Sequence, residues 1–99
     1  MKILLACSAG MSTSLLEKAL NDYMAANGIK GSAIAKGSES AKGELDKYDV
    51  VLLGPQVRFM LPSFKSLAGD VPVDVIPAAD YAMAKGENVY NFAKKLTGK

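Results

Sequence analysis

Histidine and tryptophan are absent from this 99-residue chain, and cysteine occurs once, at Cys7. The lack of histidine excludes histidine metal sites, Cys–His pairs and Ser–His–Asp triads built from this chain alone. A single cysteine excludes an intrachain disulfide and a thiolate cluster for zinc or an iron–sulfur centre. We therefore expect neither a metal nor a cofactor.

Long apolar runs are also missing. None approaches the roughly 20 residues that a membrane-spanning helix requires. The segment that ends in Cys7 resembles the cleavage box of a bacterial lipoprotein, but only residues 3–6 form an apolar stretch before the cysteine. A secretory signal needs about 7–15 apolar residues there. With a free thiol, these absences predict a soluble protein of the reducing cytoplasm.

The charge of the chain is nearly balanced. Twelve basic and 10 acidic residues give a net charge of +2 and are spread along the sequence. No basic run or series of interleaved aromatics supports a nucleic-acid surface. Apolar residues make up 49% of the chain, enough for one modest core, and no shift in composition marks a linker. The sequence predicts a single domain over residues 1–99.

Short apolar runs alternate with helical patterns along the chain. Strands are expected at residues 3–6, 29–35, 49–53 and 71–76. Helices are expected at residues 13–27, 38–45, 57–67 and 88–96, with Ser38 as a candidate cap and Pro62 interrupting the third helix. Strands separated by helices form right-handed crossovers onto a parallel sheet. We predict a three-layer α/β domain with a four-stranded parallel sheet, order 2-1-3-4, and helices on both faces.

In such open sheets, ligands bind beyond the carboxyl ends of the strands, where the strand order reverses. The loops expected at that edge are residues 7–14, 38–40, 54–56 and 77–83. With strands one and three adjacent, Cys7 and the Gly54-Pro55-Gln56 turn should be neighbours across the crevice.

The loop that begins at Cys7 contains small and hydroxyl residues, and Ser12 or Thr13 can cap the helix that follows. Converging backbone N–H groups in such a loop bind an anion, and a helix N-terminus favours a thiolate. The loop lacks both a Gly-Lys-Ser/Thr element and any basic residue, so it is not a nucleotide P-loop. From the residues alone, two interpretations stay open. One is an anion-binding thiol, and the other is a small buried side chain beside an ordinary capping segment.

Three collinear blocks resemble one family. The run CSAGMSTS, from Cys7 to Ser14, resembles the active-site loop of the enzyme IIB proteins of the lactose/cellobiose (chitobiose) family. These proteins belong to the bacterial phosphoenolpyruvate-dependent sugar phosphotransferase system. Residues 49–62 are similar to the family's third strand and helix, and residues 71–76 with 80–83 to its fourth strand and loop. The chain departs from the family pattern at Pro77 and Ala82.

This resemblance implies a phosphotransferase that acts as a phosphocarrier. Cys7 would accept a phosphoryl group from a phosphohistidine of the partner protein IIA. It would then pass the group to a sugar, a β-linked disaccharide, bound by the membrane permease IIC. The residues implied to bind phosphate are Ser8, Ala9, Gly10, Met11, Ser12, Thr13 and Ser14. The residues implied to contact partners are Met11, Gly54, Pro55, Gln56, Asp80 and Tyr81. We expect a monomer that neither binds nucleic acid nor inserts into a membrane.

The main rival is a low-molecular-weight tyrosine phosphatase, an enzyme whose fold is similar to the one predicted. Its loop places an arginine six residues after the nucleophilic cysteine, where this chain has Thr13. Asp80 lies where that enzyme has its general acid, although a surface aspartate is the ordinary interpretation. Without an arginine to stabilise charge on phosphorus, hydrolysis should be slow.

A non-catalytic interaction module is the second alternative. In that case the thiol is incidental, and Met11, Val57, Phe59 and Met60 form a docking face. Apolar residues at helical spacing belong to a core more often, so we expect some of residues 57–61 to be buried. Arg58, in the same segment, is either a solvated charge or an aid to anion binding.

Overall fold

The computed structural model of the protein describes residues 1–7 and 13–98. Its centre is a four-stranded parallel sheet of β1 (Lys2–Cys7), β2 (Ser32–Gly37), β3 (Val50–Leu53) and β4 (Val73–Val75). The strand order is β2-β1-β3-β4, which confirms the predicted topology. Within residues 1–7 and 13–98, no helix combines the length and apolar character needed to cross a membrane.

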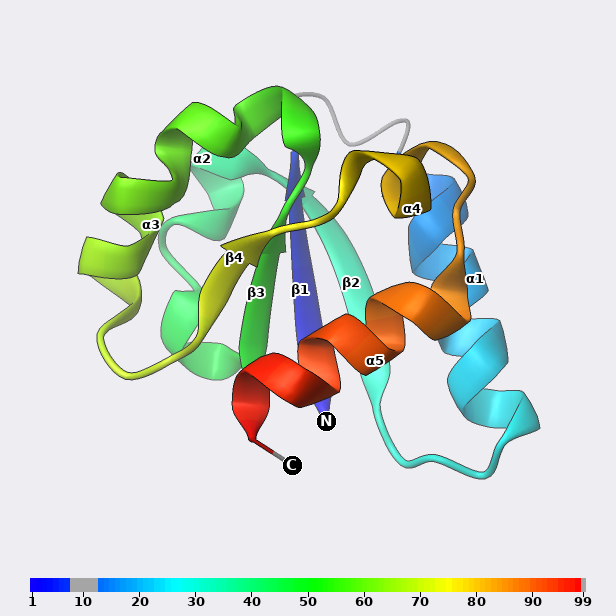
Figure 1. The fold of residues 1–99 in the computed structure, drawn as a ribbon. Helices are drawn as coiled ribbons and strands as arrows, with labels where there is room; N and C mark the ends of the chain where they lie inside the picture. The colour runs from blue at the N-terminus through cyan, green and yellow to red at the C-terminus, as the bar shows by residue number, and fades with distance from the viewer. Residues whose placement is uncertain (8–12, 99) are drawn as a thin grey trace.

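Helices cover both faces of this sheet (Figure 1). On one face lie α1 (Thr13–Ala26) and α5 (Gly86–Thr97). On the other face lie α2 (Ser38–Ala41), α3 (Leu61–Ala68) and the 3₁₀ turns η1 (Leu45–Lys47) and η2 (Pro55–Met60). A short helix, α4 (Ala78–Ala82), follows β4 at its carboxyl end. The three predicted layers are therefore confirmed.

The two central strands carry the core, because their side chains are buried on both faces of the sheet. Ile3 and Leu5 of β1 pack with α1 and α5, whereas Leu4 and Ala6 pack on the side of α3. All four residues of β3 are buried in the same alternating manner. The apolar run at residues 50–53 thus forms a strand covered on both sides, as predicted, while Asp49, the first residue of the predicted strand, is exposed and lies outside it.

Some predicted element boundaries are wrong, each for a local reason. The second strand begins at Ser32 rather than at residue 29, and Gly31 precedes it. The expected helix over residues 57–67 is two elements, η2 and α3, and Pro62 lies in the first turn of α3. Proline is tolerated there because the first-turn N–H groups have no partner within the helix. Ser38 is not the cap of α2, since Gly37 occupies that position and Ser38 is buried.

Two further elements differ from the expected pattern. The helix expected at residues 38–45 is short, because α2 ends at Ala41 and η1 begins only at Leu45. The segment expected as a loop at residues 77–83 contains α4, whose five residues include no buried side chain. Without a buried stripe, a helix of this length leaves no periodic signal in the sequence.

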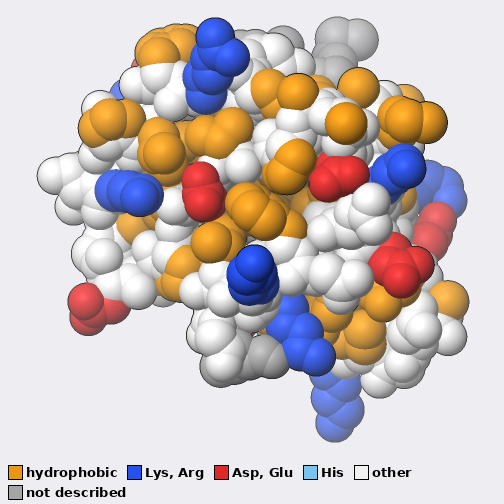
Figure 2. Space-filling view, viewed as in Figure 1, with side chains coloured by type: hydrophobic (Ala, Val, Ile, Leu, Met, Phe, Trp, Pro, Cys, Tyr) orange, Lys and Arg blue, Asp and Glu red, His pale blue; other side chains and the backbone are white. Residues whose placement is uncertain are grey.

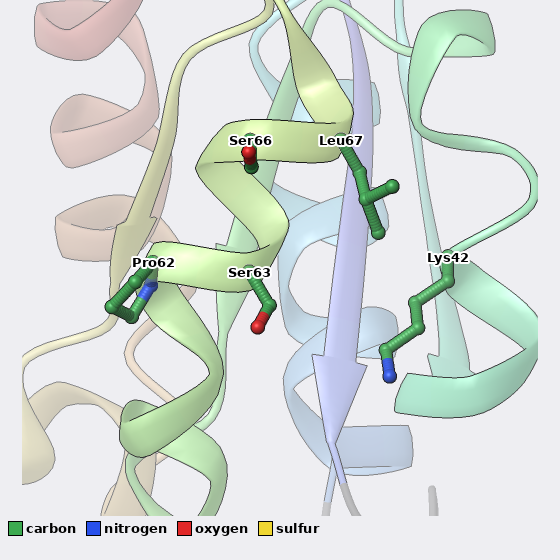
Figure 3. A pocket seen from close by; sticks show the side chains of 5 residues that line it. All are labelled: Lys42, Pro62, Ser63, Ser66 and Leu67. Atoms are coloured by element: carbon green, nitrogen blue, oxygen red, sulfur yellow. The ribbon is translucent and has the colours of Figure 1, made fainter.

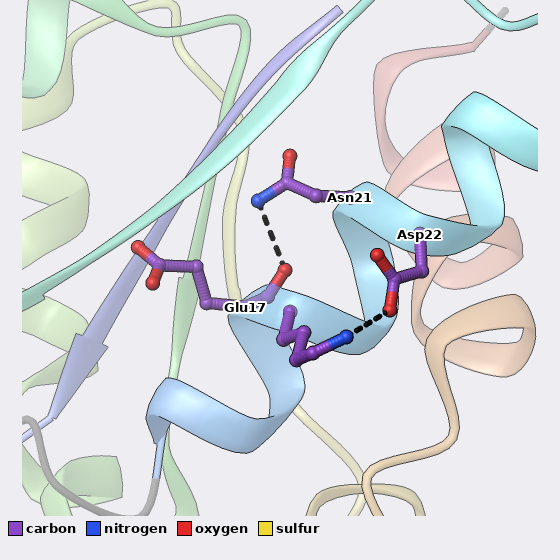
Figure 4. Close-up of polar contacts among 4 residues, drawn as sticks. Glu17, Asn21 and Asp22 are labelled. Atoms are coloured by element: carbon purple, nitrogen blue, oxygen red, sulfur yellow. Dashed lines mark hydrogen bonds and ion pairs between the residues drawn. The ribbon is translucent and has the colours of Figure 1, made fainter.

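Side chains occupy outward-facing backbone groups of both edge strands. Asn21 of α1 donates from Nδ2 to the Ala33 carbonyl oxygen at 3.0 Å and accepts from the Ala33 N–H at 2.9 Å. Glu17 accepts from the Ala35 N–H at 2.6 Å. Figure 4 shows Glu17 and Asn21 extending from α1 toward β2, while Asp22 pairs with Lys18. On β4, the Val75 N–H donates to the Asp74 carboxylate at 2.7 Å.

Replacing Asn21 by alanine is expected to destabilise the protein by about 1–2 kcal/mol, because two backbone groups of Ala33 lose their partners. Urea unfolding measures this loss as a lower midpoint at unchanged slope. The neighbouring Asp22→Ala variant is the control, since it removes only an exposed ion pair with Lys18 and should leave the midpoint unchanged. Equal midpoints for the two variants would contradict a stabilising role for the Asn21 contacts.

Candidate functional site

Cys7 is the last residue of β1 and is 1% exposed. On one side it pairs in register with Gly37 of β2. On the other side the chain leaves β3 at Gly54, whose N–H donates to the Ala6 carbonyl oxygen at 2.8 Å. Cys7 therefore lies where the strand order reverses, between the carboxyl ends of β1 and β3, as the sequence predicted.

Gly54 lies at a point where three side chains converge. A Cβ atom at this position would be 3.4 Å from the Cys7 Cβ, 3.4 Å from the Tyr81 Cε2 and 2.7 Å from the Gln56 Oε1. These side chains come from the end of β1, from α4 and from the start of η2. Because glycine has no side chain, there is room at Gly54 for three separate segments to meet. The sequence predicted Cys7 and Gly54 as neighbours and placed the segments of Gln56 and Tyr81 at the same edge, but it did not predict which of their side chains meet.

Hydrogen bonds from adjacent residues tie α4 to two other elements. Tyr81 accepts at its hydroxyl from the Gln56 Nε2 at 3.2 Å, which joins α4 to η2. Asp80 accepts from the Asn88 Nδ2 at 3.1 Å, which joins α4 to α5. The Tyr81 ring is half-buried and packs against the core between the sheet and helices α1 and α5. The Asp80 carboxylate therefore has a structural partner in the position considered for a general acid.

The predicted phosphate-binding loop is described only in part. Ser8, Ala9, Gly10, Met11 and Ser12 lie outside the described residues, so the expected exposure of Met11 and the capping role of Ser12 are untested. Thr13 is the first residue of α1, as expected, and Ser14 is exposed in its first turn. Of the turn after β3, Gly54 is buried, Pro55 half-buried and Gln56 exposed.

The residues considered for a docking face divide between core and surface. Val57 is buried, and Met60 and Leu61 pack against the core on the side of α3. Phe59, by contrast, is 75% exposed, and Arg58 beside it is also exposed. Val57 is therefore wrong as a docking residue, whereas the prediction that part of residues 57–61 belongs to the core is confirmed.

Three exposed apolar side chains lie in the segments that come after β1, β3 and β4. They are Leu15 in the first turn of α1, Phe59 of η2 and Met83 just after α4. Figure 2 shows apolar side chains exposed on the upper part of the molecule, over η2 and α4. Sequence reasoning missed Leu15 and Met83. Leu15 lies off the buried face of α1, and Met83 follows a helix without a buried residue, so neither one belongs to an apolar period in the sequence.

A groove of about 540 Å³ lies apart from the predicted site. Figure 3 shows its lining, which is Lys42, Pro62, Ser63, Ser66 and Leu67. None of the residues predicted for phosphate or partner binding contributes to it. The Lys42 ammonium pairs with Glu39 at 3.4 Å. The groove is lined by α3 and by the residue after α2, not by the turns that follow β1 and β3.

Glu44 forms the centre of a charged cluster near the carboxyl end of β2. It accepts a hydrogen bond from the Lys36 ammonium and lies 3.9 Å from the Lys47 Nζ. The bond from Lys36, with the charges of Lys36 and Lys47, holds the pKa of the Glu44 carboxyl below its ordinary value of 4.5, against the effect of burial. The same bond raises the pKa of Lys36.

A pH-dependent contribution to stability follows from the lowered pKa of Glu44. The contribution is present above the ordinary pKa and is lost as the pH falls through the lower pKa of the folded state. Glu44→Gln is therefore expected to lower the melting temperature at pH 7, and the difference from wild type should shrink below about pH 4. Glu39→Gln, at an exposed ion pair, is the matched control. A difference that persists undiminished at pH 3 would contradict this origin.

The arrangement around Cys7 suits a nucleophile that meets a partner at the edge of the sheet. The thiol is the only one in the chain, and the chain has no histidine to act beside it as acid or base. Thiolates attack electrophilic centres such as phosphorus and form covalent intermediates. If another protein supplies the electrophile together with its leaving group, the reaction needs no histidine in this chain to act as acid or base.

Comparison with known proteins identifies relatives over almost the whole chain. Residues 2–92 match the family model described as "PTS system, Lactose/Cellobiose specific IIB subunit". The oligo-beta-mannoside-specific EIIB component of Bacillus subtilis is 40% identical over 97 residues, covering 96% of this chain and 94% of the relative. The galactose-specific and cellobiose-specific EIIB components of Lactococcus lactis are each 42% identical over 101 residues, covering 95% of this chain and 94% of each relative.

Solved structures of similar proteins share the fold. The lactose-specific IIB component domain from Streptococcus pneumoniae superposes with a TM-score of 0.82, over 97% of this chain and 96% of that one, at 17% identity. The cellobiose-specific IIB component from Borrelia burgdorferi gives a TM-score of 0.81, over 99% of this chain and 92% of that one, at 33% identity.

Proposed function

The chain belongs to the lactose/cellobiose-specific IIB family of the sugar phosphotransferase system, and from that premise we propose that it is a cytoplasmic phosphocarrier that loads a phosphoryl group onto Cys7. The donor is a phosphohistidine of a IIA protein, and the acceptor is a sugar bound by a membrane IIC component. The observation that carries the proposal is the position of Cys7. The only thiol of the chain ends β1 at the point where the strand order reverses, beside Gly54.

The proposed transfer has two balanced steps. In the first, the Cys7 thiolate attacks phosphorus, the S–P bond forms, the P–N bond breaks, and the electron pair returns to the imidazole nitrogen of the donor. In the second, a sugar hydroxyl attacks the same phosphorus, the O–P bond forms and the S–P bond breaks. The thiolate is regenerated, and the hydroxyl proton passes to the solvent. Positioning and charge stabilisation supply most of the catalysis in such transfers.

We assign the remaining site residues to phosphate binding and to partner contact. The backbone amides of Ser8 to Ser14 hold the phosphoryl oxygens, with the hydroxyls of Ser12, Thr13 and Ser14 as further donors. This loop has no arginine or lysine, which favours a stored phosphoryl group over a rapidly hydrolysed one. Partner contacts come from Met11, Gly54, Pro55, Gln56, Asp80 and Tyr81. Since donor and acceptor approach the same edge of the sheet, the protein binds one partner at a time, and we propose that it does so as a monomer.

For the sugar, we propose a β-linked disaccharide. Relatives named for oligo-beta-mannoside and for cellobiose are 40% and 42% identical to the chain, which supports this class. A relative named for galactose is as similar as these, so identity alone does not rank the sugars.

The test of the proposed function is phosphoryl loading followed by discharge. The protein is incubated with phosphoenolpyruvate, the general phosphotransfer proteins and a IIA protein, and its intact mass is measured. We expect the gain of one phosphoryl group, mapped to the Cys7 peptide, and its loss when membranes with IIC and a β-linked disaccharide are added. Failure to gain mass with any of several IIA donors would overturn the proposal. Rapid turnover of an aryl phosphate by the isolated chain would support a phosphatase instead.

A further inference from the structure

The Gly54 backbone and the Tyr81 ring lie on the side of Cys7 toward β3 and α4. Gly54 is buried, and the place of its missing Cβ is 3.4 Å from both the Cys7 Cβ and the Tyr81 Cε2. The Cys7 side chain and the Tyr81 ring are therefore in van der Waals reach of the same point. A thiol that is 1% exposed must become accessible before it can meet phosphorus on another protein.

None of the residues of α4 is buried, and the half-buried Tyr81 ring packs against the core. Side-chain hydrogen bonds also attach this helix to its neighbours. One of these bonds, from the Gln56 amide at 3.2 Å, spans Gly54 from η2 to α4. Another, from Asn88 to Asp80, ties α4 to α5. Short helices with little buried surface open locally at low cost in free energy.

We propose that Tyr81, held by the Gln56 amide, is a positioning residue for Cys7. Its ring walls the thiol on the side of β3, and the Gln56–Tyr81 hydrogen bond sets how often that wall opens. A side chain at Gly54 would lie 2.7 Å from the Gln56 Oε1 and would displace the amide that holds Tyr81.

This role has a consequence for the loaded protein, and that consequence rests on the function proposed above. Water that reaches the phosphocysteine attacks phosphorus, breaks the S–P bond and releases inorganic phosphate and the free thiol. The phosphoryl group is then no longer available for transfer to the sugar. A wall that keeps water from the thiol prolongs the life of the loaded state, which a carrier needs between its two partners.

The first experiment uses the unloaded protein, so it does not depend on phosphoryl transfer. The rate at which iodoacetamide alkylates Cys7 is measured by intact mass for wild type, Tyr81→Phe and Gln56→Ala. Each variant removes the hydrogen bond and keeps the rest of the wall, and each should raise the rate about 2- to 10-fold, the factor expected for one hydrogen bond. Tyr81→Ala, which also removes the ring, should raise it further.

A double-mutant cycle separates this bond from a general loss of stability. If the bond controls the opening, the Tyr81→Phe/Gln56→Ala double variant alkylates no faster than the faster single variant. Tyr48→Phe is the matched control, because this half-buried tyrosine packs on the opposite side of the sheet. Loss of its hydroxyl should leave the alkylation rate of Cys7 unchanged. Unchanged rates in both single variants, or additive effects in the double variant, would overturn the inference.

The second experiment uses the loaded protein. After removal of the donor, release of inorganic phosphate should be faster in Tyr81→Phe and Gln56→Ala than in wild type, by a factor similar to that for alkylation. If wild type is never loaded at Cys7, the proposed function fails while the alkylation result stands. If loading succeeds but alkylation and phosphate release are as slow in the variants as in wild type, the positioning role fails and the carrier function stands.

Discussion

Replacing Cys7 by alanine is expected to abolish phosphoryl loading completely, because the chain contains no second thiol and no histidine that could accept the group. Cys7→Ser should fail as well, since a serine hydroxyl without an adjacent base is a far weaker nucleophile than a thiolate. The measurement is intact mass after incubation with phosphoenolpyruvate, the general phosphotransfer proteins and a IIA protein. Wild type gains one phosphoryl group, and neither variant gains any.

Folding must be checked in the same variants, because Cys7 is buried. Alanine removes only the sulfur atom, whereas serine places a hydroxyl at the end of β1 and costs about 1–3 kcal/mol if that group stays unpaired. Both variants should melt cooperatively, with alanine the more stable of the two. A phosphoryl group on well-folded Cys7→Ala protein would place the acceptor elsewhere and contradict the assignment.

A large effect on stability is expected at Gly86, the first residue of α5. A Cβ at this position would lie 2.5 Å from the Ala19 carbonyl oxygen and 2.7 Å from the Ala19 carbonyl carbon, both backbone atoms of α1. Backbone cannot rotate aside as a side chain does, so Gly86→Ala must push α1 and α5 apart. We expect a loss of about 3 kcal/mol, the upper end of the usual cost of overpacking. Thermal unfolding should show this as a fall in melting temperature of more than about 10 °C.

Gly43→Ala is the matched control for this substitution. A Cβ at Gly43 meets no atom within 4 Å, and the residue is exposed. The same chemical change should therefore leave the melting temperature close to that of wild type. If both variants melt alike, the close approach of α1 and α5 does not limit the packing.

The central strands were predictable, because buried parallel strands are unbroken apolar runs, and the single hand of their crossovers places helices on both faces once the strand order is given. The run at residues 50–53 shows this directly. The role of Pro62 was predicted wrongly, because a proline indicates a break in a helix but not whether it ends one helix or begins the next. The helix α4 was missed because it buries no residue, so that no apolar period marks it.

The candidate site, like the fold, could be predicted from the sequence only in part. Topology alone placed Cys7 beside Gly54, since both follow adjacent parallel strands at the same edge. The bond between Gln56 and Tyr81 joins residues 25 positions apart, and no local pattern encodes such a pair. It depends on how α4 is seated against η2, which only the assembled fold determines.

The blocked edges of the sheet limit the ways in which another protein can recognise this one. Backbone groups of Ala33, Ala35 and Val75 are already occupied by the protein's own side chains. A partner therefore cannot add a strand there, and strand addition is the mode of recognition that depends least on side-chain identity. Recognition is left to side chains and loop shapes. For the phosphocarrier proposed above, the closed edges therefore leave the choice of donor and acceptor, and with it the route of the phosphoryl group, to those side chains and loops.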